Sequence, residues 1–397
     1  MDKPLSRCIQ LHEGESCQLF SGFRGTGKST ELLRLKAQLE KDDYTVLLID
    51  LFDCHDMEHL LAIEDLVVIL AAAVGDWANK EGLGTIVDEF WEELSSFFKT
   101  ELALSEVKLS VKPVELKFGV RNASPFWKEA RGKLATSLNG LVKQAHAFIE
   151  QKVQKIQKAR NGNPVVLIFD SLEKLGGSEA NFRDTMDSVI RVFSQFPSYL
   201  RLPKCHVIYT IPPYATIMDP HVEEHYDCSL LKPLPAIKIT EKGPDGPGYE
   251  PGYAALRSLV DKRVPLEQLF GKDTSGINLL IKFSGGHVRT LIRMMRELLL
   301  RFGDEPFPLG LTQVRKVVND FQEKVVLSVR PEGVAMLETI RKTNSITDVR
   351  DDELELLARY MDHHMVLCYQ NGDGWFQIHE LIKNNVQVRA ARGEKGK

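Results

Sequence analysis

The stretch GFRGTGKST, which begins at Gly22, restricts the fold of this chain more than any other feature. It matches the pattern G-x-x-x-x-G-K-[ST], with Gly22, Gly27, Lys28 and Ser29 at the fixed positions. It follows the apolar run Cys17–Ser21, which predicts a strand, and it opens STELLRLKAQLE, which predicts a helix. Glycines let backbone N–H groups close around a phosphate, Lys28 places a cation on the outer phosphates, and Ser29 can hold Mg²⁺. The stretch therefore predicts a phosphate-binding loop in a parallel α/β fold.

An acidic residue at the end of a buried strand is the expected partner of this loop, because Mg²⁺ that bridges the phosphates needs a second oxygen ligand near Ser29. Asp170 meets this requirement at the end of the apolar run Val165–Phe169. Ser29 and Asp170 are therefore the predicted metal ligands. Many ATPases with such a loop place a water-activating glutamate directly after the aspartate. This chain has Ser171 there, which cannot act as a base at neutral pH.

Short runs rich in Val, Ile and Leu alternate with long helical patterns, which is typical of βαβ units in a parallel sheet covered on both faces. The predicted strands are Cys17–Ser21, Thr45–Asp50, Val165–Phe169, His206–Thr210 and Ala236–Thr240. Residues 53–162 are longer than a normal crossover, and they are expected to form an insertion within a core of residues 1–240. We expect helices over 64–82 and 86–102, a hairpin over 107–120 and a helical stretch over 124–160 in this insertion.

The Pro/Gly cluster EKGPDGPGYEPGY, which begins at Glu241, marks the best domain boundary. Only helical patterns follow it, and they predict a helical lid over 241–328. The last segment, 329–397, has two helical patterns and then two short strands around the tight turn Asn371-Gly372-Asp373-Gly374. Helices followed by such a hairpin predict a winged helix. The predicted fold class is α/β, a P-loop NTPase parallel sheet with a helical lid and a C-terminal winged helix.

Taken with GFRGTGKST, the sequence FDSLEK resembles the STAND class of signal-transduction ATPases in the AAA/AAA+-like superfamily, with the NACHT branch as the nearest. The resemblance covers nearly the whole chain in order. It implies ATP or ADP with Mg²⁺ as ligands, Asp170 as the Mg²⁺ ligand and Glu173 as the catalytic base. The loop residues that it implies in nucleotide binding are Gly22, Phe23, Arg24, Gly25, Thr26, Gly27, Lys28, Ser29 and Thr30.

Two further stretches carry the resemblance. WFQIHELIKNN looks like the Met-His-Asp-Leu motif of STAND receptors, whose histidine contacts the bound diphosphate, and it implies this role for His379. FSGGHVRTLIRMMREL resembles the small-domain motif in which a glycine pair opens a helix with a sensing arginine, which would be Arg289, with Arg293 one turn on. The chain departs from the family at Val288, where proline is usual, and at Thr210, where many members have a phosphate-sensing arginine. Thr210 could still hydrogen-bond the γ-phosphate or the attacking water, and slow hydrolysis is expected.

The composition excludes several classes of protein. A formal net charge of -4 argues against a generally basic surface for nucleic acid, and the longest apolar run is about half the length that spans a bilayer. The six cysteines are scattered and form no CxxC pair, which predicts a reduced, cytoplasmic chain. Two clusters offer Zn²⁺ ligands, but neither has a fourth ligand nearby, so histidine-containing loops are favoured. The clusters are His221, His225 and Cys228, and Cys54, His55 and His59.

Together these features predict an ATP-binding molecular switch with slow or partner-triggered hydrolysis. The chain shows no sensor repeats and no effector domain, so we expect a separate effector or sensor protein as partner, as in bacterial defence or regulatory systems, and a homo- or hetero-oligomer. One alternative is an AAA+ ATPase that acts on DNA in transposition or replication initiation, which the acidic stretch DDELELLARYMDHH in the winged helix disfavours. The other alternative is a hydrolysis-dead nucleotide-binding scaffold.

Overall fold

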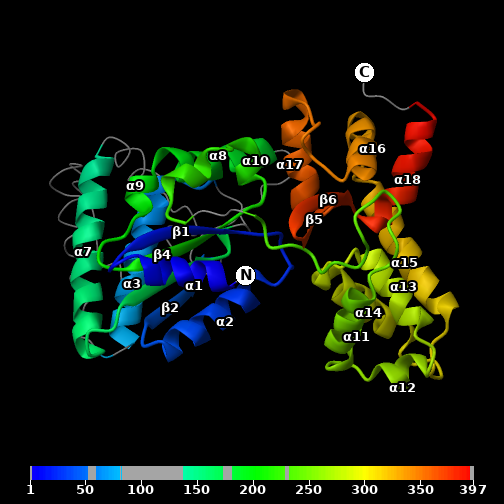
Figure 1. Cartoon of the computed structure of the whole chain (residues 1–397), viewed down its shortest axis with the longest axis horizontal. Helices are drawn as coiled ribbons and strands as arrows, with labels where there is room; N and C mark the ends of the chain where they lie inside the picture. The colour runs from blue at the N-terminus through cyan, green and yellow to red at the C-terminus, as the bar shows by residue number, and fades with distance from the viewer. Residues whose placement is uncertain are drawn as a thin grey trace, which may run out of the picture. The chain divides into compact units, whose positions relative to one another are not determined.

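The structure is a computed structural model that describes residues 2–51, 60–80, 82, 137–172, 181–228 and 232–393 (Figure 1). The chain divides into two compact units. The first comprises Met1–Ser21 and Ser29–Leu231, and the second comprises Gly22–Lys28 and Lys232–Lys397. The phosphate-binding loop thus belongs to the second unit, although the strand before it and most of the helix after it belong to the first. The predicted domain limits at residues 240 and 328 stay predictions.

A parallel sheet of four strands is the centre of the first unit. Its strands are β1 (Ser16–Ser21), β2 (Thr45–Asp50), β3 (Val165–Asp170) and β4 (His206–Ile211), in the order β1-β4-β3-β2. Every residue of β1, β3 and β4 is buried, as expected for strands that are covered on both faces and read as continuous apolar runs. These four strands confirm the sequence-based prediction.

Helices surround this sheet (Figure 1). They are α1 (Asp2–Leu11), α2 (Lys28–Lys41), α3 (Ile63–Lys80), α7 (Leu138–Ala159), α8 (Phe182–Gln195), α9 (Pro197–Leu200), α10 (Ala215–Met218) and the 3₁₀ turn η3 (Val222–His225). Alternate residues of β3, such as Val165, Leu167 and Phe169, share one apolar core with α3, α7 and α8. Much of this core therefore comes from α3 and α7, two helices that belong to the predicted insertion.

Part of the predicted insertion can be compared with the structure. The helix expected over 64–82 is α3, and the stretch expected over 124–160 contains α7. The second helix, expected over 86–102, and the hairpin, expected over 107–120, lie outside the described residues.

The fifth predicted strand, Ala236–Thr240, is wrong: this segment forms no strand of the sheet. Pro233 and Pro235 have no N–H groups and interrupt any ladder of hydrogen bonds. Only an isolated parallel bridge joins Leu234 to Gly22. The Ala236 N–H donates instead to Cys368 O (2.9 Å), and the Ile237 N–H donates to Gly286 O (3.1 Å). The segment is thus held by the second unit, to which it belongs.

The second unit contains the expected helical lid and winged helix. The lid consists of α11 (Glu250–Asp261), α12 (Leu266–Phe270), α13 (Ser275–Ser284), α14 (Val288–Phe302) and α15 (Leu311–Val326). The winged helix consists of η4 (Pro331–Gly333), α16 (Val334–Thr343), η5 (Asp351–Glu353), α17 (Leu354–Asp362), β5 (Val366–Asn371), β6 (Asp373–Ile378) and α18 (Glu380–Ala391). Leu381 of α18 packs into the lid core, so the two modules share apolar contacts.

Local sequence explains the elements of this unit. Helix α14 buries Leu291, Met294, Met295 and Leu298, whose spacing places them on one face of a helix. The β5–β6 hairpin turns at Gly372, which has φ +78°, a conformation that glycine adopts without steric cost. The predicted hairpin around Asn371-Gly372-Asp373-Gly374 is confirmed. Among the described residues, no helix is both long and apolar enough to cross a bilayer.

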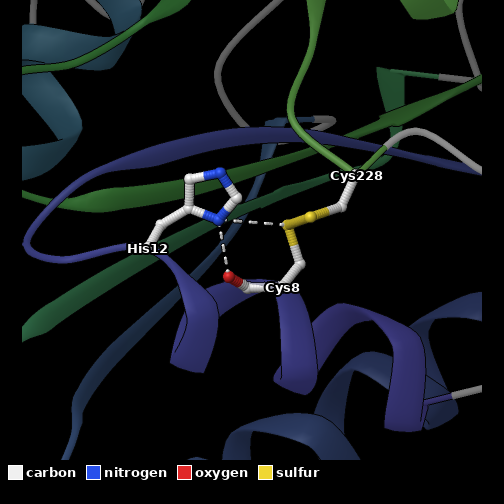
Figure 2. Close-up of side chains that lie close together, drawn as sticks. All are labelled: Cys8, His12 and Cys228. Carbon is white, nitrogen blue, oxygen red and sulfur yellow. Dashed lines mark hydrogen bonds between the residues drawn. A yellow bond between two sulfur atoms is a disulfide. The ribbon is translucent and has the colours of Figure 1, made fainter.

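Six cysteines were expected to be reduced, and that expectation is wrong for one pair. Cys8 of α1 and Cys228, which follows η3, are joined by a disulfide (Figure 2). Cys17, Cys205 and Cys368 are free and buried. Burial raises the pKa of each of these thiols and keeps them protonated.

A substitution at Gly286 tests whether the close approach of its backbone to Ile237 holds the lid in place. A Cβ atom there would lie 1.8 Å from the Ile237 carbonyl oxygen, and Gly286 has φ +72°. We expect Gly286→Ala to lower the free energy of unfolding by about 3 kcal/mol or more, because a backbone contact cannot relax as a side chain can. Gly372→Ala is the matched control, since φ is +78° there but nothing lies within 4 Å of the added carbon; it should cost about 1 kcal/mol. Urea unfolding of both variants measures the difference, and equal losses would contradict the steric explanation.

Candidate nucleotide-binding site

The predicted phosphate-binding loop joins β1 to α2. Gly25 and Gly27 have φ values of +84° and +104°, which a side chain would oppose. The Lys28 ammonium lies within the loop, 4% exposed, and donates hydrogen bonds to Gly22 O (2.8 Å) and Phe23 O (2.9 Å). The loop therefore curls around the cation of Lys28, the first residue of α2, which is the arrangement that favours an anion at a helix N-terminus.

The predicted metal ligands lie together in the first unit. The Ser29 hydroxyl donates to Asp170 Oδ2 at 2.5 Å, and Asp170 Oδ1 accepts from the Ser171 N–H at 2.7 Å. Asp170 is 4% exposed at the end of β3. A hydroxyl and a carboxylate at this distance form the hard oxygen donor set that Mg²⁺ prefers. Because Ser29 follows the loop directly, these residues fit a cation that is bound together with phosphate.

The chain turns sharply after Asp170. Ser171 has φ +79°, unusual for a residue with a side chain. The next N–H, that of Leu172, donates to Thr210 Oγ1 at 3.2 Å. Since β4 lies between β1 and β3 and Thr210 is level with Phe20 of β1, Thr210 holds the end of the acidic strand at the edge where the loop begins. Its predicted contact with phosphate or water stays a prediction. Glu173, the predicted base, lies outside the described residues.

A buried histidine of the lid binds the loop within the second unit. His287 Nε2 donates to the Arg24 carbonyl oxygen at 2.7 Å, and His287 Nδ1 lies 2.8 Å from Thr290 Oγ1. Because a carbonyl can only accept, the Nε2 atom carries the proton and Nδ1 accepts from the threonine hydroxyl. Both ring nitrogens are thus satisfied by a neutral imidazole. No sequence motif pointed to this role of His287 beyond its position after the glycine pair.

The predicted sensing arginine lies against the same loop. A Cβ atom built on Gly25 would lie 2.6 Å from Arg289 Cβ and 2.9 Å from Arg289 Nε. Arg289 is thus packed over Gly25, and only glycine leaves room for it. Arg293, one turn on, lies with its guanidinium 5.8 Å from the centre of the Phe321 ring. Of these two arginines, the structure brings Arg289 next to the loop; its contact with nucleotide stays a prediction.

The winged helix also contacts the loop, through residues that sequence reasoning did not assign to the site. Asp362 at the end of α17 forms an ion pair with Arg24, with 3.6 Å between Oδ1 and Nε. The His364 ring packs edge-on to Phe23 at 6.4 Å between centroids, and it lies 4.4 Å from the His287 ring. His364 Nδ1 is buried and has no hydrogen-bond partner among the described residues. Only the fold brings residues so distant in sequence to the loop.

His379 occupies a helix cap. Its Nδ1 accepts from the Leu381 N–H at 3.2 Å at the start of α18, and a further hydrogen bond joins the ring to the Ser284 backbone. The side chain is 3% exposed. His379 thereby ties the winged helix to the end of α13, next to the glycine pair. Its predicted contact with the diphosphate stays a prediction.

Electrostatics make this part of the site favourable for anions. Burial lowers the pKa of His287 to about 4 and that of His379 to about 3. Burial, and then the neighbouring imidazoles and arginines, hold the pKa of His364 well below its usual range. These histidines are therefore neutral at pH 7, and the positive charge comes from Lys28, Arg24 and Arg289, which suits a polyanionic ligand.

Comparisons with known proteins give no family. No protein family and no curated protein matches the chain. Among solved structures, the Orc2 protein of Aeropyrum pernix in ADPNP-ADP complexes is 11% identical, with 98% of this chain and 94% of that chain covered and a TM-score of 0.39. Cdc6p of Pyrobaculum aerophilum is also 11% identical, with 99% and 94% covered and a TM-score of 0.38. Similarity at this level supports no functional inference.

The depressed pKa of His287 predicts how stability depends on pH. Between pH 6.5 and about 4, His287 is protonated in the unfolded chain but stays neutral in the folded protein. The free energy of unfolding therefore falls as the pH falls through this window. His287→Gln keeps a donor for the Arg24 carbonyl but cannot titrate. We expect the variant to lose less stability than wild type on going from pH 7 to pH 4, by up to about 3 kcal/mol.

Urea unfolding at several pH values measures this difference. His221→Gln, which removes an exposed histidine from the other unit, is the control and should retain the wild-type fall in stability on acidification. An unchanged pH dependence in His287→Gln would show that the imidazole is not held neutral by the fold.

Proposed function

We propose that this protein is an ATP-binding molecular switch of the AAA-like superfamily, STAND in type, whose nucleotide state is read directly by its lid and winged helix. The observation that carries the proposal is the second unit itself, which includes the loop Gly22–Lys28. Within that unit the lid donates to the Arg24 carbonyl and the winged helix pairs with the Arg24 side chain. A phosphate bound by the loop therefore acts on groups that both modules hold.

In this proposal the loop Gly22–Lys28 surrounds the phosphates of ATP or ADP through its N–H groups, and Lys28 neutralises the outer phosphates. Thr30 continues the first turn of α2 beside them. Ser29 and Asp170 would hold Mg²⁺, which supplies charge neutralisation on the phosphate oxygens. The short Ser29–Asp170 contact supports this assignment, because it brings a hydroxyl and a carboxylate oxygen next to each other at the start of α2.

Slow hydrolysis follows from what flanks Asp170. Ser171 is a poor base, so the proposed base is Glu173, which would take a proton from the attacking water. Thr210 would orient that water, and Arg289 would stabilise negative charge on the phosphate. A partner protein that orders these groups would accelerate the step.

In the proposed switch, the bound phosphate and a carboxylate of the winged helix compete for the same arginine. Arg24 is paired with Asp362 of the winged helix, and a terminal phosphate near the loop would compete with this carboxylate for the guanidinium. His364, next to Phe23, has a buried Nδ1 with no hydrogen-bond partner in the part of the chain that the structure describes, and a phosphate oxygen could engage it. ATP and ADP differ by one charged phosphate, so they would bias the contacts of α17 differently. A separate effector or sensor subunit would read that change.

The acidic start of α17 supports a protein partner over DNA. Arg350 is paired with Asp352 (3.1 Å) and Glu353 (3.3 Å), and Arg359 is paired with Glu355 (3.6 Å). The cations of this surface are therefore neutralised within it, and the remaining carboxylates would repel phosphate. Salt-dependent DNA binding with DNA-stimulated turnover would overturn this preference.

Nucleotide binding and turnover are tested separately. Lys28→Ala should weaken ATP binding at least about tenfold, because it removes the cation at the phosphates. Lys36→Ala is the matched control on the same helix, where the ammonium pairs with Glu40 and lies outside the loop. Calorimetric titration with Mg-ATP gives both affinities. Wild-type affinity in Lys28→Ala would place the nucleotide elsewhere.

In the same experiment Glu173→Gln should bind ATP normally and lose turnover by about 100-fold or more, measured as phosphate release alone and with co-purifying proteins. Normal hydrolysis by this variant would show that the base lies elsewhere. Tight binding without any turnover by wild type would favour a nucleotide that is only structural.

The switch has its own test. In wild type, replacing ADP with a non-hydrolysable ATP analogue should change deuterium uptake in peptides from α14 and α17. Arg289→Ala should remove most of that difference while still binding nucleotide, because Arg289 is the lid cation packed on the loop. Arg296→Ala, exposed on the same helix, should behave as wild type. Identical uptake with both nucleotides in wild type would contradict a switch.

A further inference from the structure

A compact set of atoms that could bind a metal lies in the first unit, whereas the phosphate-binding loop belongs to the second unit. Cys8 and His12 are one turn apart on and just after α1, so they share a face of the chain. Cys228, 220 residues from Cys8, is bonded to it through sulfur. His12 Nδ1 lies 3.8 Å from Cys8 Sγ, and Figure 2 shows the ring edge next to the sulfur pair. The ligand atoms of all three residues lie within 4.8 Å of one another.

Once the disulfide is reduced, this set has the composition of a zinc site. Two thiolates and an imidazole are ligands that Zn²⁺ prefers, and tetrahedral bonds of about 2.3 Å to sulfur and 2.0 Å to nitrogen place neighbouring ligand atoms about 3.6 Å apart. The distance from Cys8 Sγ to His12 Nδ1 is already 3.8 Å. Only the two sulfur atoms need to separate, and Cys228 is exposed at the surface, so solvent can supply the fourth ligand.

The protein holds these ligands in place without the disulfide. Asp227, next to Cys228, accepts from the Cys17 N–H at 2.9 Å and pairs with Arg201 at 2.5 Å. On the other side, Cys8 and Ile9 of α1 are each 1% exposed, so the helix is anchored by burial. Both ends of the site therefore remain near their positions when the sulfur bond opens, and such preorganisation favours metal binding.

Zinc binding requires one proton rearrangement at His12. In the structure, Nδ1 lies 2.9 Å from the Cys8 carbonyl oxygen and, because a carbonyl can only accept, Nδ1 carries a proton. A metal ligand must offer a lone pair, so Nδ1 would lose this proton and Nε2 would carry it in the bound form. Both thiols would also be deprotonated on binding.

Disulfide and metal exclude each other, because both need the same two sulfur atoms. We propose that Cys8, His12 and Cys228 form a redox-controlled Zn²⁺ site, loaded when the cysteines are reduced and emptied when they form the disulfide. With hydrogen peroxide as oxidant, the two thiolates give up two electrons and form the S–S bond. The O–O bond breaks, two protons are taken up to give two water molecules, and Zn²⁺ leaves. A dithiol or phosphine reductant reverses the sulfur chemistry.

This assignment replaces the zinc cluster that the sequence offered around Cys228. His221 precedes η3 and His225 is its last residue, and His221 pairs with Glu224 at 2.8 Å. Among the described residues, the metal-competent group that includes Cys228 is completed by Cys8 and His12. The site joins α1 to Cys228, which lies three residues before Leu231, where the first unit ends. Bound zinc in the reduced protein, or the disulfide in the oxidised protein, would hold these two segments together.

The test uses the full chain. Protein reduced with a phosphine is mixed with ZnCl₂, desalted and assayed for zinc by mass spectrometry of the element. We expect about one equivalent of zinc in wild type, in keeping with one such three-ligand cluster, and loss of that zinc after treatment with peroxide. Cys8→Ser and Cys228→Ser should each abolish stoichiometric binding, and His12→Ala should weaken it at least about tenfold.

Matched variants separate this site from others. His225→Ala and Cys368→Ser remove the same residue types elsewhere and should bind zinc as wild type does. Cys54→Ser tests the other sequence cluster, which lies outside the described residues, and should also bind normally. A second readout is alkylation: zinc should protect Cys8 and Cys228 from iodoacetamide, and this protection should disappear in His12→Ala.

Three results would overturn the proposal. They are zinc content in reduced wild type no higher than in Cys8→Ser, zinc that remains bound after the disulfide has formed, and loss of zinc in Cys54→Ser alone. The far-ultraviolet circular dichroism spectrum of each variant serves as the check on folding.

Discussion

The hydrogen bond from His287 to the Arg24 carbonyl is the interaction on which the functional part of the structure depends. It fixes the protonation state of a buried imidazole and joins the phosphate-binding loop to the lid. The bond forms because Gly25 leaves space for Arg289 and because Gly286 lets the chain pass close to Ile237. Small residues at both places allow the backbone of the lid to approach the loop, and no larger residue would fit.

The basic side chains around this bond divide into neutral histidines and permanently charged cations. The histidines of the lid and winged helix are neutral because they are buried, while the permanent cations belong to the loop and to the start of α14. Asp362 supplies one carboxylate that balances Arg24. An anion entering the loop meets cations that cannot lose their charge and a carboxylate that can be displaced from its partner. In the proposed switch, the response to nucleotide would therefore rest on the Arg24–Asp362 ion pair.

The first unit contains a second proposed sensor of another kind. In the proposals made above, its sulfur and imidazole groups would respond to redox state and metal, whereas the loop would respond to phosphate. The groups are anchored by different means: burial holds α1, and the Asp227–Arg201 pair holds the segment before Cys228. Because the cross-link spans 220 residues of sequence, it restricts the unfolded chain strongly, and oxidation or metal loading would stabilise this unit.

The sequence by itself determined the features that are written in short stretches. The loop, the aspartate at the end of β3, the four strands of the parallel sheet and the turn at Gly372 follow from residue types at fixed local spacing, and local spacing is what backbone geometry translates directly. Tertiary structure decided the rest. Residues Ala236–Thr240 have the sequence pattern of a strand but form none. The prolines just before them have no N–H groups to donate, and the Ala236 and Ile237 N–H groups donate to the carbonyls of Cys368 and Gly286. His364, Asp362 and the partner of Cys228 lie far along the chain from what they contact. No local pattern encodes such pairings, because they depend on where folding places distant segments.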